Sequence, residues 1–183
     1  MRINTAKQVA REGAKPAIGT MCNCGSPLIA EWLGHSGYDF IVVDLQHGEN
    51  NLGNVQAMLQ ALSSTNATPV VRVPGNQSLF IQRVLDLGAY GVIVPQVDTP
   101  DIANRVAQAA RYAPTGKRGM NAFAPGHDFA TQPSARERMD HLNQQVYVTA
   151  MLESGEAFRH LDEIVQTPGI DAFTIGPTDL AQD

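Results

Sequence analysis

The segment YDFIVVDLQHG, residues 38–48, decides how this chain folds. Its continuous run of aromatic and β-branched apolar residues is typical of a strand buried on both faces, as in a parallel α/β sheet. The run ends in Asp44, Gln46 and His47, so these polar side chains follow the carboxyl end of the predicted strand. Ligands bind beyond such ends in parallel α/β folds, and the segment therefore predicts both a parallel sheet and a site at its edge.

The rest of the chain alternates short β-type runs with amphipathic segments. The predicted strands are Ala17–Met21, Phe40–Asp44, Pro69–Val73, Gly91–Val94, Val146–Leu152 and Ala172–Ile175. The predicted helices are Leu28–Leu33, Val55–Leu62, Leu79–Leu87, Ile102–Ala110 and Ala157–Val165, whose apolar residues recur at helical spacing. This series of βα units has no linker or low-complexity stretch, and it predicts a single α/β domain over residues 1–183.

Composition narrows the classes of partner. The chain is 43% hydrophobic, carries a formal charge of −5 and has no stripe of lysine and arginine, so we expect no binding to nucleic acid. Residues 1–15 lack the apolar centre of a signal peptide, and no apolar run has the length of a membrane span. We therefore expect a cytoplasmic protein that acts on small molecules. Cys22 and Cys24 are too close in sequence for an easy disulfide, and we expect reduced thiols.

One connection, from Tyr112 to about Arg136, is longer and richer in glycine and proline than its neighbours. Long loops in compact domains are usually lids or partner contacts. Arg118 within it is either solvated, which is the commoner case, or aimed at an anion. His127 has no assigned role, and the remaining histidines are expected on helix surfaces: His35, His141 and His160.

Ionisable residues follow several of the predicted strands. They are Asp44, His47, Arg72, Glu153 and Asp179. Because the carboxyl ends of parallel strands meet at one edge of a sheet, we expect these side chains to gather there. A single charged residue in a loop is ordinary, but a set of this size favours a catalytic site.

The carboxylates of this set predict a metal site. Glu153 and Asp179 offer hard oxygen ligands, which suit Mg²⁺ or Mn²⁺ with positions left open for substrate. A metal of this kind acts as a Lewis acid on a carbonyl and stabilises the enolate formed from it. The turn Gly176–Thr178 precedes the start of a predicted helix, whose free amides favour an anionic carboxylate. Alone, the same turn could simply break the strand and cap the helix.

The other members of the set suit acid and base chemistry. Arg72 carries a permanent forked charge that fits a carboxylate or an enolate oxygen. His47 has an ordinary pKa near neutrality and is the candidate general base. Either Asp44 or Asp86 could orient its imidazole by accepting a hydrogen bond.

Several segments together, in one order along the chain, resemble the HpcH/HpaI family of metal-dependent pyruvate aldolases. They are Gly37–Phe40, Val43–His47, Pro69–Pro74, Leu85–Ala89, Val94–Val97, Arg111–Gly119, Glu153–Ser154 and Ile175–Leu180. The resemblance runs from about Ile18 to the last residue. Each segment is weakly specific, but their common order makes the resemblance specific.

The resemblance implies a TIM-type (β/α)₈ barrel, of which this chain would carry about the first six βα units. It implies a homo-oligomer, a hexamer that exchanges its last helix between neighbours. It also implies a divalent cofactor, Mg²⁺, Mn²⁺ or Co²⁺. The reaction would be reversible cleavage of a 4-hydroxy-2-oxo acid into pyruvate and an aldehyde, which makes the protein a carbon-carbon lyase.

The resemblance also implies a role for each matching residue. Glu153 and Asp179 would bind the metal, and the backbone amides of Thr178 and Asp179 would receive the pyruvate carboxylate. Arg72 would hold the C2 oxygen. The remaining roles fall to three residues: His47 as the acid and base for the hydroxyl, Asp86 as its support, and Asp44 as the organiser of water at the metal.

Two departures leave alternatives open. Gln46 stands where many relatives have glutamate, so substrate and metal preference are open. The chain has 183 residues, whereas a complete barrel needs about 250, so we expect a domain incomplete at its carboxyl end, from a longer protein rather than a shortened natural form. The alternatives are an oxaloacetate decarboxylase or macrophomate synthase-like enzyme, and a non-catalytic assembly subunit. The related acyl-CoA lyases lack support because no nucleotide-binding feature is present.

Overall fold

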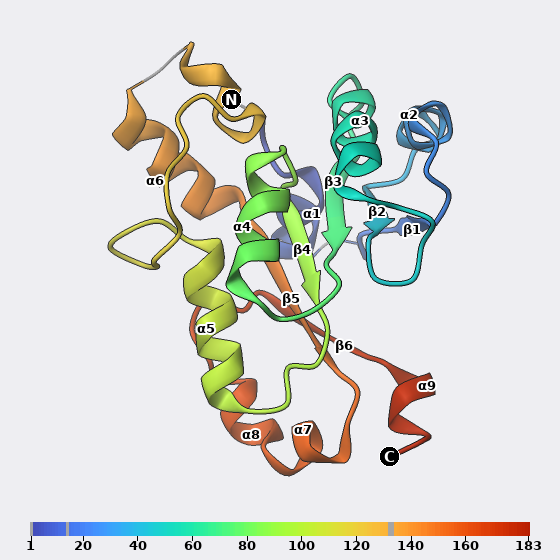
Figure 1. The fold of residues 1–183 in the computed structure, drawn as a ribbon, viewed down its shortest axis with the longest axis vertical. Helices are drawn as coiled ribbons and strands as arrows, with labels where there is room; N and C mark the ends of the chain where they lie inside the picture. The colour runs from blue at the N-terminus through green and yellow to red at the C-terminus, as the bar shows by residue number, and fades with distance from the viewer. Residues whose placement is uncertain (1, 14, 132–133) are drawn as a thin grey trace.

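The computed structural model describes residues 2–13, 15–131 and 134–183, and it confirms the parallel sheet. Six strands lie side by side in chain order and curl into part of a barrel (Figure 1). They are β1 (Gly19–Cys22), β2 (Phe40–Asp44), β3 (Thr68–Arg72), β4 (Gly91–Val94), β5 (Tyr147–Leu152) and β6 (Ala172–Ile175). Every neighbouring pair is parallel, so all carboxyl ends share one rim. β1 begins two residues later than predicted, and β3 begins one residue earlier.

The connecting helices cover the outer face of this sheet (Figure 1). They are α2 (Pro27–His35), α3 (Leu52–Leu62), α4 (Ser78–Asp86), α5 (Pro100–Ala110), α7 (Gly155–Arg159) and α8 (Leu161–Ile164). A last short helix, α9 (Pro177–Leu180), stands beyond the end of β6 (Figure 1). The helix predicted over Ala157–Val165 is wrong as a single element, because the backbone leaves helical geometry at His160. Three further elements were not predicted: α1 (Thr5–Glu12), α6 (Ala135–Gln145) and the 3₁₀ segment Pro125–Ala130.

The two faces of the sheet differ because side chains alternate along each strand. Ile41 and Val43 of β2 are fully buried in the core formed with the outer helices, where they belong to the same cluster as Met58 of α3. On the other face, Val42 and Val70 border a cavity of about 390 Å³ inside the curl. The apolar run that predicted β2 thus serves both faces, as the sequence pattern indicated.

A buried ion cluster closes the amino ends of the strands. The Nζ atom of Lys7 on α1 lies 3.0 Å from one carboxylate oxygen of Asp171, and Arg111 lies 2.8 Å from the other. Asp171 precedes β6, and Nζ of Lys7 also donates to the carbonyl of Val146, which precedes β5. α1 is therefore fastened across the rim opposite the strand carboxyl ends.

Substitution of Asp171 by alanine is expected to lower the free energy of unfolding by about 3–5 kcal/mol, because it leaves two buried cations without their carboxylate. The side chains of Lys7 and Arg111 are only 6% and 9% exposed, so water cannot replace the lost partner. Urea unfolding followed by circular dichroism measures the change. Asp162→Ala, at an exposed position on α8, is the matched control and should change stability by less than about 0.5 kcal/mol. Equal stability of both variants would contradict the proposal that Asp171 stabilises the fold by pairing with Lys7 and Arg111.

The long connection after α5 is mostly exposed, but a few of its side chains pack into the protein. Arg118 is 5% exposed, and its guanidinium lies 2.7 Å from the carboxylate of Asp86 and 4.5 Å from the ring centre of Tyr112. The commoner expectation for Arg118, a solvated side chain, is therefore wrong. His127 is buried too, with its Nε2 atom 2.5 Å from the hydroxyl of Tyr112. This contact joins the middle of the connection to its start.

The three histidines expected on helix surfaces lie at helix ends or within a helix. His35 is exposed at the end of α2, and His160 joins α7 to α8, with an intermediate exposure. His141 is less solvated than expected, because its Nε2 atom lies 2.8 Å from the carbonyl oxygen of Arg2. Among the described residues, no helix combines the length and the apolar character that crossing a membrane requires.

Candidate functional site

An ion pair joins the carboxyl ends of β2 and β3. Asp44 and Arg72 occupy paired positions in the two strands. Arg72 donates through Nε to one oxygen of Asp44 at 2.8 Å and through a terminal nitrogen to the other at 2.6 Å. Asp44 is fully buried, and the side chain of Arg72 is 17% exposed. This forked geometry fixes the plane of the guanidinium at the rim.

The same carboxylate organises the loop after β2. The backbone amides of Gln46 and His47 donate to Asp44 at 3.1 and 3.3 Å. Burial alone would raise the pKa of Asp44, but the hydrogen bonds from Arg72 and from these amides outweigh burial and lower it. Asp44 is therefore ionised at neutral pH, and it anchors the backbone that carries His47.

His47 itself is exposed at this rim, where a ligand can reach its imidazole. Asp86, predicted to support it, lies elsewhere: it ends α4, whose carboxyl end faces the amino ends of the strands. The carboxylate of Asp86 instead accepts a hydrogen bond from Arg118. Within this chain Asp86 thus lies at the opposite rim from His47, because a helix returning along a strand ends there, and its support of His47 stays a prediction.

Glu153 follows β5 and is almost buried, with 6% of its surface exposed. Its Oε1 atom accepts a hydrogen bond from the backbone amide of Gln96 at 2.8 Å. Burial raises the pKa of Glu153; the Gln96 amide partly offsets this, and the carboxylates of Asp179 and Asp98 raise it further. The two predicted metal ligands, Glu153 and Asp179, are therefore electrostatic neighbours that repel one another when both are ionised.

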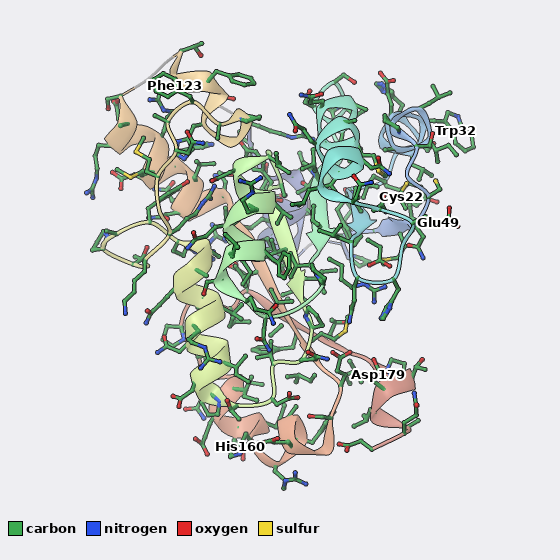
Figure 2. The ribbon with its side chains drawn as sticks, viewed as in Figure 1. Cys22, Trp32, Glu49, Phe123, His160 and Asp179 are labelled. Carbon is green, nitrogen blue, oxygen red and sulfur yellow. The ribbon has the colours of Figure 1, made fainter. Side chains whose placement is uncertain are left out.

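The turn after β6 leads into α9, whose first backbone amides make no hydrogen bond within the helix. Hydrogen bonds within α9 begin with the amide of Leu180, which donates to the carbonyl of Gly176 at 3.1 Å. The amides of Thr178 and Asp179 precede that bond, so they are among those that a helix leaves unpaired. Asp179 is labelled on α9 in Figure 2, where this helix stands beyond the end of β6. The sequence prediction that these amides are available to an anion is consistent with this geometry.

The donor set fits a hard divalent cation. Within the described part of the chain, no group of three or more histidine, cysteine or acidic residues forms a candidate metal cluster. Mg²⁺, however, usually takes only one or two carboxylates and keeps several waters. In the loop after β2, the side-chain oxygens of Gln46 and Asn50 are buried without a hydrogen-bond partner, so each can accept a hydrogen bond from a water molecule. A cation between Glu153 and Asp179 would also remove their mutual repulsion.

Three positioning residues escaped the sequence reasoning. Gln96 has φ +56°, an unusual angle for a residue with a side chain, and this backbone aims its amide at Glu153. The side-chain nitrogen of Asn76 donates to the backbone carbonyl of Gln96 at 2.8 Å and holds that backbone conformation. Asn50 donates to the carbonyl of Asp44 at 2.9 Å. No sequence pattern reports a left-handed backbone at glutamine, and loop asparagines are too common to single out.

Gly176→Ala is expected to displace the Glu153 carboxylate. A Cβ atom at position 176 would lie 2.7 Å from both Cβ and Oε2 of Glu153, which is closer than side chains approach one another. We expect at least a tenfold weaker affinity for Mn²⁺, measured by isothermal titration calorimetry. Gly119→Ala is the control, because a Cβ there meets no atom within 4 Å. Unchanged Mn²⁺ affinity in Gly176→Ala would contradict the placement of the site at Glu153.

Comparison with known proteins identifies the family of this chain. The family model for HpcH/HpaI aldolase/citrate lyase matches residues 18–183. The hydroxypyruvate/pyruvate aldolase of Agrobacterium fabrum is 37% identical over 177 residues, which are 96% of this chain and 65% of that protein. The 5-keto-4-deoxy-D-glucarate aldolase of Klebsiella pneumoniae is 34% identical over 164 residues, 90% of this chain and 63% of that protein. The chain thus spans a little under two thirds of the length of these relatives.

A solved structure supports the fold over almost the whole chain. The HpcH/HpaI aldolase/citrate lyase family protein from Burkholderia cenocepacia matches with a TM-score of 0.90 at 33% sequence identity. The match covers 98% of this chain and 71% of that protein. The prediction that the chain carries the first six βα units of a TIM-type barrel is confirmed by this similarity and by the order of the strands.

Proposed function

The chain belongs to the HpcH/HpaI aldolase/citrate lyase family, and from this premise we propose that its carboxyl rim is the pyruvate-handling site of a metal-dependent aldolase. The reaction is the reversible cleavage of a 4-hydroxy-2-oxo acid to pyruvate and an aldehyde. The observation that carries the proposal is the grouping of Arg72 with three carboxylates. The pKa of Arg72 is raised first by its hydrogen bond to Asp44 and then by the charges of Glu153 and Asp179.

In this proposal, Glu153 and Asp179 hold a divalent cation, which supplies Lewis-acid polarisation of the 2-oxo group when it is bound. The substrate carboxylate accepts hydrogen bonds from the amides of Thr178 and Asp179. Arg72 faces the C2 oxygen with a guanidinium whose plane is already fixed by Asp44. Because Arg72 is oriented before the substrate arrives, little reorganisation is needed as negative charge develops on that oxygen.

His47 performs the proton transfer. One nitrogen of its imidazole accepts the proton of the C4 hydroxyl, the C3–C4 bond breaks, and the electron pair moves toward the C2 oxygen that Arg72 faces. In the reverse direction the same nitrogen returns the proton to the new alkoxide. Asp44 contributes indirectly, because it holds both the guanidinium of Arg72 and the backbone amide of His47.

Two observations support a proposal for the substrate class. The relatives named above are aldolases for hydroxypyruvate with pyruvate and for 5-keto-4-deoxy-D-glucarate, which are small, oxygen-rich acids. The loop after β2 carries two neutral side chains close to Asp44, since the backbone amide of Gln46 donates to the Asp44 carboxylate and the side-chain nitrogen of Asn50 donates to its carbonyl. We therefore propose a hydroxylated aldehyde as the acceptor, since neutral amides can pair with its hydroxyl groups without repelling a neighbouring carboxylate.

The test is product analysis with a panel of 4-hydroxy-2-oxo acids and with oxaloacetate, with and without Mn²⁺. We expect pyruvate and aldehyde in equal amounts, only with metal, and a rate at least about 100-fold lower in His47→Ala. His35→Ala is the matched control, because His35 is exposed at the end of α2. Release of CO₂ from oxaloacetate alone would replace the aldolase by a decarboxylase. No turnover with any metal would replace it by a non-catalytic assembly role.

A further inference from the structure

Two thiol groups meet at the carboxyl end of β1. The Sγ atoms of Cys22 and Cys24 lie 3.9 Å apart, and both cysteines are free. A disulfide needs about 2.05 Å between sulfurs, so the pair must approach by about 1.9 Å. Rotation of two side chains separated by one residue, with a small adjustment of the peptide between them, can supply a movement of that size. In Figure 2, the label of Cys22 lies next to that of Glu49, which belongs to the loop after β2.

The two sulfurs differ in exposure, which sets an order of reaction. Cys22 is 2% exposed, whereas Cys24 is only partly buried and meets solvent first. Burial, together with the hydrogen bond to Cys24 and the charge of its thiolate, raises the pKa of Cys22 to about 12. Cys22 is therefore a protonated thiol at neutral pH, and Cys24 is the sulfur that a peroxide meets first.

We propose that Cys22 and Cys24 form a reversible disulfide when the protein meets a hydroperoxide, and that this is a modification site of the protein. The sulfur of Cys24 attacks one peroxide oxygen, the O–O bond breaks, and an alcohol or water leaves, which makes a sulfenic acid on Cys24. The sulfur of Cys22 then displaces the hydroxyl group as water, and the S–S bond forms. Two thiols are oxidised, one peroxide is reduced, and no other reactant is needed.

The position of this pair connects it to the loop of His47. The carbonyl of Asn23, which lies between the two cysteines, accepts a hydrogen bond from the amide of Glu49 at 2.9 Å. A Cβ atom at Gly48 would lie 2.9 Å from the same carbonyl, so the two loops are in direct contact. Ring closure between residues 22 and 24 reorients the Asn23 peptide and loosens its hold on residues 47–49. A ring this small is strained, so mild thiol reductants reopen it.

The test counts thiols and needs no assay of the proposed reaction, so its failure is distinct from failure of the aldolase proposal. The chain has only two cysteines, which makes the count unambiguous. The number of free thiols per chain is measured by titration with a chromogenic disulfide. After treatment with hydrogen peroxide at a small molar excess, this number should fall from two to none. Mass spectrometry under non-reducing conditions should show a monomer lighter by two hydrogen atoms, and dithiothreitol should restore both thiols.

Single variants and amide exchange complete the design. Cys22→Ser and Cys24→Ser should each retain one cysteine and lose the two-hydrogen mass change. Hydrogen exchange of a peptide containing Glu49 should accelerate at least about threefold in the oxidised protein, and by less in the oxidised Cys22→Ser variant. Two unreacted thiols, products that gain oxygen, or only disulfide-linked dimers would each overturn the proposal. An oxidised monomer with unchanged exchange at Glu49 would overturn the link to the His47 loop.

Discussion

Glu153→Gln is expected to lower kcat/KM for aldol cleavage by at least about 100-fold, since loss of even an outer-shell partner of a metal site costs 10- to 100-fold. The same substitution should not lower the stability of the metal-free protein. The pKa of Glu153 is raised by burial and by Asp179 and Asp98, so ionisation of this carboxyl opposes folding once the pH exceeds its unfolded pKa of about 4.3. At neutral pH, a neutral amide removes that cost while still accepting the hydrogen bond from Gln96.

In Glu153→Gln, activity should fall while the stability of the metal-free protein should not. This combination distinguishes a metal ligand from a structural carboxylate. In the unsubstituted protein, Mn²⁺ should raise the melting temperature, because a ligand that binds only the folded state stabilises it. In Glu153→Gln, this metal-dependent rise should vanish while the metal-free melting temperature stays equal or increases. Glu156→Gln is the control, because Glu156 is exposed one turn away at the start of α7. A full Mn²⁺ response in Glu153→Gln would remove Glu153 from the proposed metal site.

The second large effect is on stability. Arg72→Ala is expected to lower the free energy of unfolding by about 3–5 kcal/mol, because it leaves the fully buried carboxylate of Asp44 without its cation. Urea unfolding at pH 7 measures this, and Arg83→Ala at an exposed position of α4 is the control. In the double variant Asp44→Ala with Arg72→Ala, the loss should be smaller than the sum of the two single losses. Additive losses would contradict a coupled pair.

The pH dependence of this effect has a definite sign. The pKa of Asp44 in the folded protein lies below its unfolded value, because the hydrogen bonds from Arg72 and from two backbone amides outweigh burial. The pair therefore contributes its full stabilisation above the unfolded pKa of about 3.9 and loses it as the pH falls through the lower folded pKa. The difference in stability between the unsubstituted protein and Arg72→Ala should accordingly narrow below about pH 4.

Prediction from sequence succeeded where an element has a strong pattern and failed where contacts distant in sequence supply the stability. β2 was predicted with its observed bounds, since its apolar run satisfies a strand buried on both faces. α1 and α6 were missed because both are largely polar. α6 buries only Arg138 and Leu142, and α1 is held by the salt bridge of Lys7 and by the side chain of Asn4.

The sequence by itself determined which polar residues stand at the carboxyl rim. Asp44, Arg72 and Glu153 each end or follow a strand, and all parallel strands end at the same edge whatever lies between them. Only the tertiary structure decided the partners: Arg72 pairs with Asp44, and Asp86 pairs with Arg118 at the opposite rim. The reason is physical. That parallel strands share one carboxyl rim follows from the alternating pattern of strands and helices. An ion pair instead depends on which helix ends and loops meet in space, and no local pattern records that.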